Sequence, residues 1–173
     1  MKKMILPLCL CLFQLLSGPV RAAAEKESQD LNGFKPLFDG KTLNGWHRLP
    51  GHDQGKWEVK GGVIAGGQEP EGKGGLLVTD AEYSDYELYA EILATYPLDT
   101  GLFLRIRDGK NHYQVTIDYR PTGEVGALYG PWPNGGGGFF QHCLTGFTYW
   151  KPDSFNRVLV RVDEARVDHA VAA

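Results

Sequence analysis

The segment from Gly101 to Asp118 constrains the fold most, because two runs of alternating side chains in it flank the turn-forming residues Asp108–Asn111. Turn residues between alternating runs are the strongest short-range signal of a β-hairpin. Successive strand residues point to opposite faces, so one face of this hairpin is apolar. If the loop holds an even number of residues, the other face carries Arg105, Gln114 and Asp118 together. This polar face is either an ordinary solvated surface or a functional one, and its mixture of Phe, Arg, Gln and Asp favours the functional interpretation.

Strands are expected through the rest of the chain as well. Alternating or turn-bounded segments recur about every ten residues, the spacing of all-β domains, and no segment shows sustained helical periodicity. The expected strand regions cover residues 33–46, 56–65, 83–94, 124–129 and 155–162. The tail beyond Val162, DEARVDHAVAA, shows nothing that would close a sheet. The sequence therefore predicts an all-β fold, an antiparallel two-sheet β-sandwich, with a barrel as the alternative.

The N-terminal segment has the pattern of a secretory signal peptide. Two lysines precede an apolar run, and Ala22-Ala23-Ala24 supplies small residues at a cleavage site. The apolar run is too short to span a membrane. We therefore expect a leader over residues 1–24, a polar linker over residues 25–32 and a single β-sandwich domain over residues 33–173. The mature protein is expected to be secreted or periplasmic, without a membrane anchor.

Removal of the leader changes both the charge and the cysteine count. It takes away Lys2, Lys3 and Arg21 and no acid, so the net charge goes from −3 to −6. An acidic protein is a poor partner for nucleic acid or anionic membranes. Only Cys143 remains, so no internal disulfide is expected and stability must come from a hydrophobic core. A buried, inert Cys143 is favoured over a nucleophile, because no cysteine-protease signature surrounds it.

Residues 67–74 have the spacing of a phosphate-binding loop without its chemistry. Gly74 stands where a metal-binding Ser or Thr is needed, and Glu69 and Glu71 lie where phosphate would bind. A strand is expected to follow, where a phosphate-binding loop would open a helix. The sequence therefore excludes nucleotide binding.

A loop rich in Gly and Pro, residues 130–140, carries Trp132 and four consecutive glycines. Loops at the edge of a rigid β-scaffold often have a binding function, and an exposed indole suits stacking on a sugar ring. A flexible connector with Trp132 packed away explains the segment equally well. Trp132 is therefore a candidate for substrate binding, with both interpretations open.

Several motifs occur together in the order seen in a known family. They are GFKPLFDGKTLNGW, the WEVKGGVIAGG hairpin, GGLLVTDAEYSDYEL, TGLFLRIRD, and YQVTID followed by GALYG. From about Gly33 to about Arg161 the chain resembles the 3-keto-disaccharide hydrolase family. The resemblance implies a concanavalin A-like jelly roll, exported by bacteria, that acts on sugars already oxidised at carbon 3. Family members continue with further strands, so this chain is expected to lack its last strands and to leave an unpaired sheet edge.

The resemblance implies glycosidic bond cleavage by elimination. A ketone at carbon 3 acidifies the proton on carbon 2, so a base can remove it, the oxygen on carbon 1 can leave, and water then adds. Such a site needs a base and a group that holds the enolate oxygen. The candidates are Asp118 as base or metal ligand and Arg105 as enolate stabiliser. The candidates for binding the oligosaccharide or glycoside substrate are Gln114, His112, Tyr129, Trp132 and Glu124. Participation of a divalent metal is left open, and no other cofactor is expected.

The chain departs from the family at two places in this region, one of them the candidate Gln114. Members often have Asn-Ser where this chain has Asp99-Thr100, and Glu where it has Gln114. A role that rests on these side chains in other members therefore does not transfer directly. Arg105 and Asp118 match the family pattern.

Less specific interpretations are also open. Arg105 and Asp118 could form a plain cross-strand salt bridge, His112 could be a solvated loop residue, and the histidines show no metal-ligand spacing. The chain could be a carbohydrate-binding module without catalysis, since jelly rolls serve both functions. An aromatic groove without shifted pKa values would favour binding, and a desolvated carboxylate beside an arginine would favour an enzyme. A chain cut short could also fail to fold stably. The particular sugar and any partner proteins are not predicted.

Overall fold

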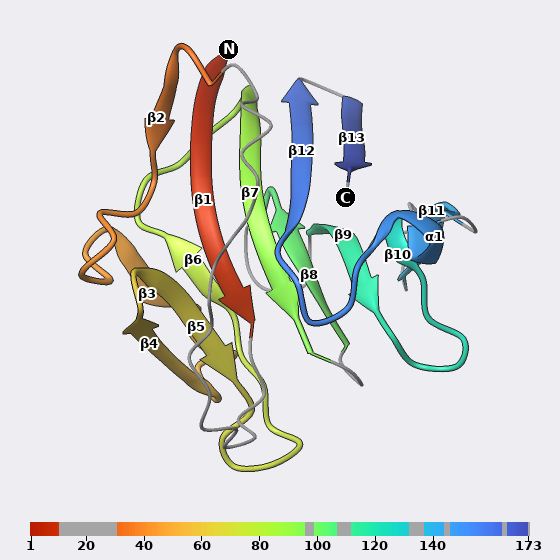
Figure 1. Ribbon diagram of the computed structural model, residues 1–173, viewed down its shortest axis with the longest axis horizontal. Coiled ribbons are helices and arrows are strands. Elements are labelled where there is room, and N and C mark those ends of the chain that lie inside the picture. The colour runs from red at the N-terminus through yellow and green to blue at the C-terminus, as the bar shows by residue number, and fades with distance from the viewer. Residues whose placement is uncertain are drawn as a thin grey trace.

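The structure of the chain is a computed structural model (Figure 1) that describes residues 1–10, 31–95, 99–106, 112–131, 137–143, 146–163 and 166–172. Strands dominate it, and α1 (Gly146–Tyr149) is a single helical turn. The strands are β1 (Lys2–Leu10), β2 (Phe34–Pro36), β3 (Trp46–Arg48), β4 (Lys56–Lys60), β5 (Val63–Gly67), β6 (Leu77–Thr79), β7 (Tyr86–Ala94), β8 (Asp99–Leu104), β9 (Tyr113–Asp118), β10 (Val125–Pro131), β11 (Gly137–Gln141), β12 (Asn156–Asp163) and β13 (Arg166–Ala172). Within these ranges, no helix is long and apolar enough to cross a membrane.

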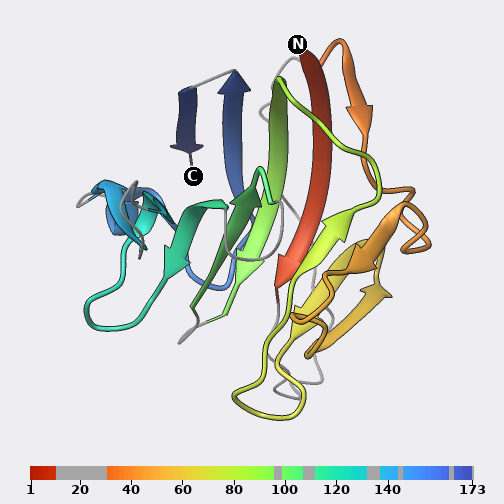
Figure 2. The same ribbon diagram turned by 180° about the vertical axis from the view of Figure 1, so that it is seen from behind.

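The strands form two packed sheets and a separate strand pair. The larger sheet has the order β13-β12-β7-β1-β5-β4, with β2 beside β1. The second sheet has the order β11-β10-β9-β8, and β3 pairs with β6. Figure 2 shows β8 and β9 in front of β7, so the four-stranded sheet covers part of the larger one. The predicted all-β, two-sheet β-sandwich is confirmed, and its architecture is that of a jelly roll.

One hydrophobic core lies between the two sheets. Alternate residues of each strand face it, as the period of two requires. The larger sheet contributes Leu88, Ala90, Ile92, Val158, Val160 and Val162, and the four-stranded sheet contributes Leu102, Leu104, Val115, Ile117, Val125 and Leu128. Burial of each large aliphatic side chain stabilises the fold by about 1.5–3 kcal/mol. The core therefore holds both sheets rigidly behind the residues at their edges.

The first ten residues lie inside the larger sheet of the uncut chain. β1 pairs with β7 on one side and with β5 and β2 on the other. Its Met4 and Leu6 side chains are 4% and 5% exposed. The sequence predicts that this segment belongs to a leader that is removed, and that cleavage stays a prediction. The structure adds that residues 2–10 take a strand position while they are still attached.

The tail of the chain also forms a strand. β13 pairs antiparallel with β12 from the Arg157↔Ala172 pair to the Asp163↔Arg166 pair. The expectation that nothing beyond Val162 would close a sheet is therefore wrong for this edge. The physical reason is that β12 offers a free row of main-chain donors and acceptors, which a weakly apolar segment can satisfy through its backbone.

Asn156 fixes the loop that leads into β12. Its side chain is 0% exposed, accepts a hydrogen bond from the Lys151 N–H at 2.7 Å and donates to the carbonyl oxygens of Lys151 at 2.8 Å and Ser154 at 2.9 Å. Asn156→Ala leaves these backbone groups without their partner, so we expect the free energy of unfolding to fall by about 1–3 kcal/mol. Urea denaturation measures the change. Lys151→Ala is the control, because Lys151 takes part only through its backbone, and equal stability of the two variants would contradict the prediction.

The predicted hairpin is formed by β8 and β9. Phe103 pairs with Gln114 and Asp99 pairs with Asp118, so odd positions of β8 lie opposite even positions of β9, as expected. The turn residues 107–111 lie outside the described residues. At the open end of the hairpin, this register brings two carboxylates face to face.

Candidate active site

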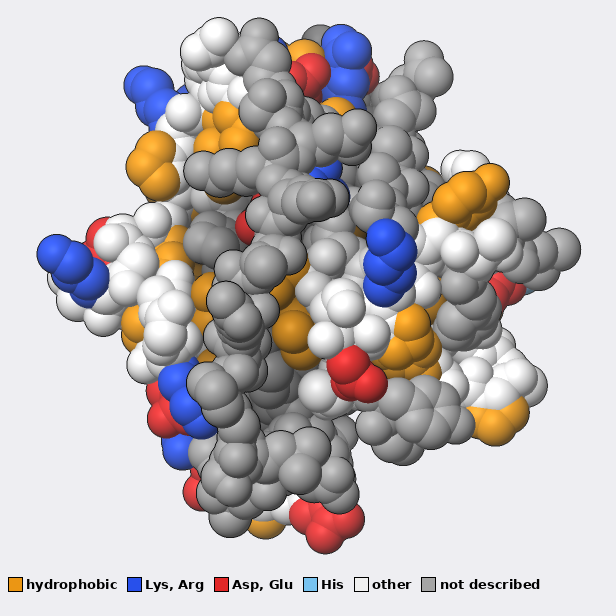
Figure 3. Space-filling view, in the orientation of Figure 1, with side chains coloured by type: hydrophobic (Ala, Val, Ile, Leu, Met, Phe, Trp, Pro, Cys, Tyr) orange, Lys and Arg blue, Asp and Glu red, His pale blue; other side chains and the backbone are white. Residues whose placement is uncertain are grey.

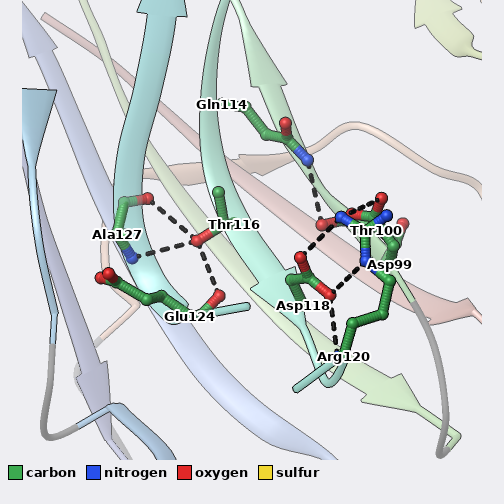
Figure 4. Close-up of polar contacts among 8 residues, drawn as sticks. All are labelled: Asp99, Thr100, Gln114, Thr116, Asp118, Arg120, Glu124 and Ala127. Atoms are coloured by element: carbon green, nitrogen blue, oxygen red, sulfur yellow. Dashed lines mark hydrogen bonds and ion pairs between the residues drawn. The ribbon is translucent and has the colours of Figure 1, made fainter. Parts of the chain in front are cut away.

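The two carboxylates at the open end of the β8–β9 hairpin share one arginine (Figure 4). Asp118 accepts hydrogen bonds from Nε of Arg120 at 2.9 Å and from its Nη2 at 2.7 Å. The same Nη2 lies 2.8 Å from Oδ2 of Asp99. The backbone N–H of Arg120 also donates to Oδ1 of Asp118 at 2.9 Å, which folds the turn after β9 back over the strand end. One cation therefore joins two acids from adjacent strands.

The two carboxyl groups differ in their electrostatic situation. Burial and the negative charge of Asp118 raise the pKa of Asp99, and Arg120 offsets this only in part. Burial also acts to raise the pKa of Asp118, but the hydrogen bonds and charge of Arg120 outweigh it and hold that pKa below its ordinary value. Asp118 therefore stays charged and holds Arg120, while Asp99 is the better proton acceptor of the two.

A cleft lies beside β8, the edge strand of the four-stranded sheet. It has a volume of about 1730 Å³, which exceeds the usual range of ligand pockets. Aromatic side chains line it together with polar ones: Trp46, Trp57, Tyr83, Phe103, Asp99, Arg105, His112 and Gln114. Aromatic rings suit the apolar faces of sugar rings, and the polar groups suit hydroxyls. The cleft is therefore large enough and mixed enough in chemistry for a disaccharide.

Arg105 lies in the cleft but not beside Asp118. β8 ends at Leu104, and Arg105 has a left-handed backbone with φ of 53°. Asp118 pairs with Asp99, which lies six residues before Arg105 in the chain. The backbones of Arg105 and Asp118 are therefore about 20 Å apart. Arg105 instead has Asp85 at 3.8 Å, while its Nη2 atom is buried without a hydrogen bond. The expectation that Arg105 and Asp118 are neighbours is therefore wrong, because residues that share one face of a hairpin can lie at its opposite ends, and the register places Asp118 opposite Asp99.

The other residues predicted for substrate binding fall into two groups. His112 and Gln114 line the cleft. The His112 ring lies 4.9 Å from the ring of Phe103, and Gln114 donates from Nε2 to the Thr100 carbonyl at 3.0 Å. Tyr129 and Glu124 are not among the residues that line the cleft; nor are Asp118 and Arg120, which reach it only through Asp99. Trp132 lies outside the described residues, so its position stays a prediction.

Tyr129 and Glu124 have structural partners at the far side of the four-stranded sheet. The Tyr129 ring packs edge-on against Phe139 with centroids 5.6 Å apart. Glu124 contacts Nδ1 of His142 at 2.6 Å and accepts the Cys143 N–H at 2.7 Å. Burial acts to raise the pKa of Glu124, but these hydrogen bonds and the charge of His142 hold it below its ordinary value. Cys143 is a free, half-buried thiol.

Sequence reasoning missed four residues of this region. Asp99 and Arg120 complete the carboxylate cluster, and the His47–Asp80 pair, with 2.6 Å between Nδ1 and Oδ1, lines the cleft from β3 and the end of β6. The alternation of the hairpin could have identified Asp99, because the pairing of position 103 with 114 also pairs 99 with 118. An Asp followed two residues later by Arg in a turn is a weaker signal, since many turn aspartates bond only to their own backbone.

The described residues do not supply a metal-binding set. Among them, no three His, Cys, Asp or Glu side chains gather closely enough to hold an ion. Both oxygens of Asp118 accept hydrogen bonds from Arg120, so this carboxylate has a cation partner already. No step below is derived through a metal.

Comparison with known proteins gives the family of this chain. A family model described as the 3-keto-alpha-glucoside-1,2-lyase-like domain matches residues 33–171. The chain belongs to this family. The match confirms the resemblance noted above and extends it through β13. A curated 3-keto-disaccharide hydrolase of Bacteroides thetaiotaomicron is 29% identical over 139 residues, which cover 60% of this chain and 48% of that protein. The chain thus spans about half the length of this relative.

Because Asp118 and Glu124 have lowered pKa values, the stability of the fold is expected to depend on pH. A carboxyl group whose pKa is lower in the folded state stabilises the fold above its unfolded pKa, about 4, and that contribution is lost as the pH falls through the folded value. We expect the free energy of unfolding to drop between pH 7 and about pH 3, and to drop less in Asp118→Asn. Urea denaturation across this range measures both slopes. Asp163→Asn, on a more exposed ion pair, should keep the parent slope, and an unchanged slope in Asp118→Asn would contradict the prediction.

Proposed function

We propose that this protein is exported and cleaves the glycosidic bonds of 3-keto-disaccharides or 3-keto-glucosides by elimination followed by hydration. The observation that carries the proposal is a carboxylate of raised pKa, Asp99, which faces the cleft beside Arg120. Family membership and the name of the Bacteroides relative support the substrate class. The leader pattern of the N-terminal segment supports export.

The cluster offers the groups that this chemistry needs. Asp99 takes the proton from carbon 2. The electron pair of the broken carbon–hydrogen bond forms an enolate, and Arg120 holds the enolate oxygen on carbon 3. The enolate then re-forms the ketone, the bond between carbon 1 and the glycosidic oxygen breaks, and the departing oxygen takes the proton that Asp99 now carries, so that a conjugated enone remains. Water adds to carbon 1 and a proton returns to carbon 2. Asp118 positions Arg120, so we move the base from Asp118 to its strand partner Asp99. Family members often have Asn at this position, so the assignment rests on the cluster in this chain and not on the family pattern.

Neither group suffices alone. General base catalysis contributes about 10²–10⁴-fold, and one donor to an oxyanion about 10²–10³-fold. The two effects act on the same enolate, which explains why a base and a cation need to be adjacent. Arg105 lies about 20 Å along β8 from Asp99, so we assign it to binding of the distant sugar unit.

A carbohydrate-binding module is the second candidate function. The aromatic lining of the cleft, with Trp46, Trp57 and Phe103, favours sugar binding whether or not a reaction follows. Figure 3 shows acidic and basic side chains intermixed over the face turned to the viewer.

Turnover of matched sugars tests the proposal. The purified protein is mixed with a 3-keto-disaccharide and, separately, with the unoxidised disaccharide. Ultraviolet absorbance follows the conjugated enone, and a second assay follows released monosaccharide. We expect turnover of the keto sugar alone. Binding of either sugar by a folded protein without turnover would establish the binding module instead.

A further inference from the structure

Strand β1 departs from the pattern of the sheets. Its pairings with β2, β5 and β7 are all parallel. Every other strand pairing among the described residues is antiparallel. Since β1 is parallel to β2, β5 and β7, these three strands run in the same direction (Figure 1). β7 pairs with β1 over Lys2–Leu10 on one side, and on the other side β2 pairs with Lys3–Ile5 and β5 with Leu8–Leu10, which leaves a slot one strand wide between them. β1 therefore fills a position that the surrounding sheet defines without it.

The residues of β1 also suit a separable strand better than a permanent one. Pro7 pairs opposite Glu91 in the middle of the sheet. Proline has no N–H to donate and is otherwise confined to edge strands, strand starts and bulges. The segment begins with two lysines, and Lys3 makes a 3.6 Å ion pair with Glu87 at the surface.

The side chains of β1 nevertheless occupy two different environments in the slot. Met4 and Leu6 belong to the hydrophobic core and line the inner end of the cleft. Lys3, which precedes Met4, is exposed, and its Nζ lies 5.3 Å from the centroid of the Phe34 ring. Main-chain pairing on both sides with pockets for alternate side chains is the mode by which sheets bind extended peptides.

We propose that β7 on one side, and β2 and β5 on the other, form a strand-acceptor site and that residues 2–10 bind it as a non-covalent strand ligand. Residues 2–10 then stay bound when the folded chain is cut between Ala24 and Glu25. The ligand class is an extended peptide with apolar side chains at alternate positions. This site does not depend on the proposed enzymatic activity.

Cutting the full chain in a controlled way tests the site. A recognition sequence for a specific protease is placed between Ala24 and Glu25, the folded protein is cut at high concentration, and size-exclusion chromatography with mass spectrometry locates the leader fragment. We expect the fragment to elute with the rest of the chain. Leu6→Asp places a charge in the core and should shift the fragment to the free peak, whereas Lys3→Gln, on the exposed side, should leave it bound.

Three outcomes would overturn the proposal. The parent fragment could elute freely while circular dichroism shows that the remaining chain is folded. The Leu6→Asp fragment could co-elute as fully as the parent, which would mean unspecific adhesion of an apolar peptide. The cut chain could lose its β-sheet signal, which would mean that the covalent connection and not the site holds the strand.

Discussion

Asp99→Asn is expected to reduce turnover of a 3-keto-disaccharide by about 10²–10⁴-fold, the usual contribution of a general base. Asn keeps the size of the side chain but does not accept the carbon 2 proton. Asp99 is the carboxylate with the raised pKa and the one that lines the cleft. Steady-state kinetics with the keto sugar measure the loss in kcat, and circular dichroism confirms that the variant is folded. Asp163→Asn is a surface carboxylate control and should retain parent turnover.

Asp118→Asn separates the two carboxylates. If Asp99 is the base, Asp118→Asn acts only through the position of Arg120, and we expect a smaller loss than in Asp99→Asn. Turnover within about threefold of the parent in Asp99→Asn, with a loss above about 100-fold in Asp118→Asn, would return the base role to Asp118. Full turnover in both variants would remove the cluster from the mechanism.

Gly123→Ala is expected to displace Asp118 in the same cluster. A Cβ on Gly123 would lie 2.5 Å from Oδ1 of Asp118 and 2.6 Å from its carbonyl oxygen. The backbone oxygen cannot move aside without disturbing the start of the turn, where the Asp118 N–H bonds the Glu124 carbonyl at 3.1 Å. We expect unfolding free energy to fall by about 1–3 kcal/mol and turnover to fall as far as in Asp118→Asn.

The control for Gly123→Ala is a glycine with room around it. A Cβ on Gly74 would find only Cγ of Gln68, at 4.0 Å. Gly74→Ala should therefore leave stability near that of the parent; because Gly74 lines the cleft, it is a control for stability and not for turnover. Urea denaturation of both variants gives the comparison, and kinetics measure the turnover of Gly123→Ala. Parent-like turnover in folded Gly123→Ala would show that the exact place of Asp118 does not matter for the reaction.

Alternation predicted the strands well, because a strand with one buried face must repeat every two residues. Leu102, Leu104, Val115 and Ile117 face the core as their spacing requires. Pairing between distant segments was harder to predict. The position of residues 2–10 beside β7, with β2 and β5 on the other side, and that of β13 beside β12, depend on main-chain edges that the rest of the sheet provides. Those edges do not appear in the side-chain pattern of either segment.

The candidate site was predicted in part. The hairpin register placed Gln114 and Asp118 correctly on β9, and Arg105 and His112 do line the cleft. The cation beside Asp118 was missed, because Arg120 reaches it through a turn and not through strand pairing. The φ of 53° at Arg105 could not be predicted either. Non-glycine residues rarely adopt this conformation, and surrounding structure, not local sequence, holds them in it.

The covalent connection between β1 and β2 raises the fraction of molecules in which β1 occupies the slot. Residues 11–33 tether the strand to the sheet that receives it. Tethers of this kind impose an effective concentration on the order of millimolar. A strand whose dissociation constant in free solution is about 10 µM would then be docked in about 99% of molecules, whatever the protein concentration. Cutting the tether removes this advantage, so the fraction of molecules with the strand bound then depends on the protein concentration.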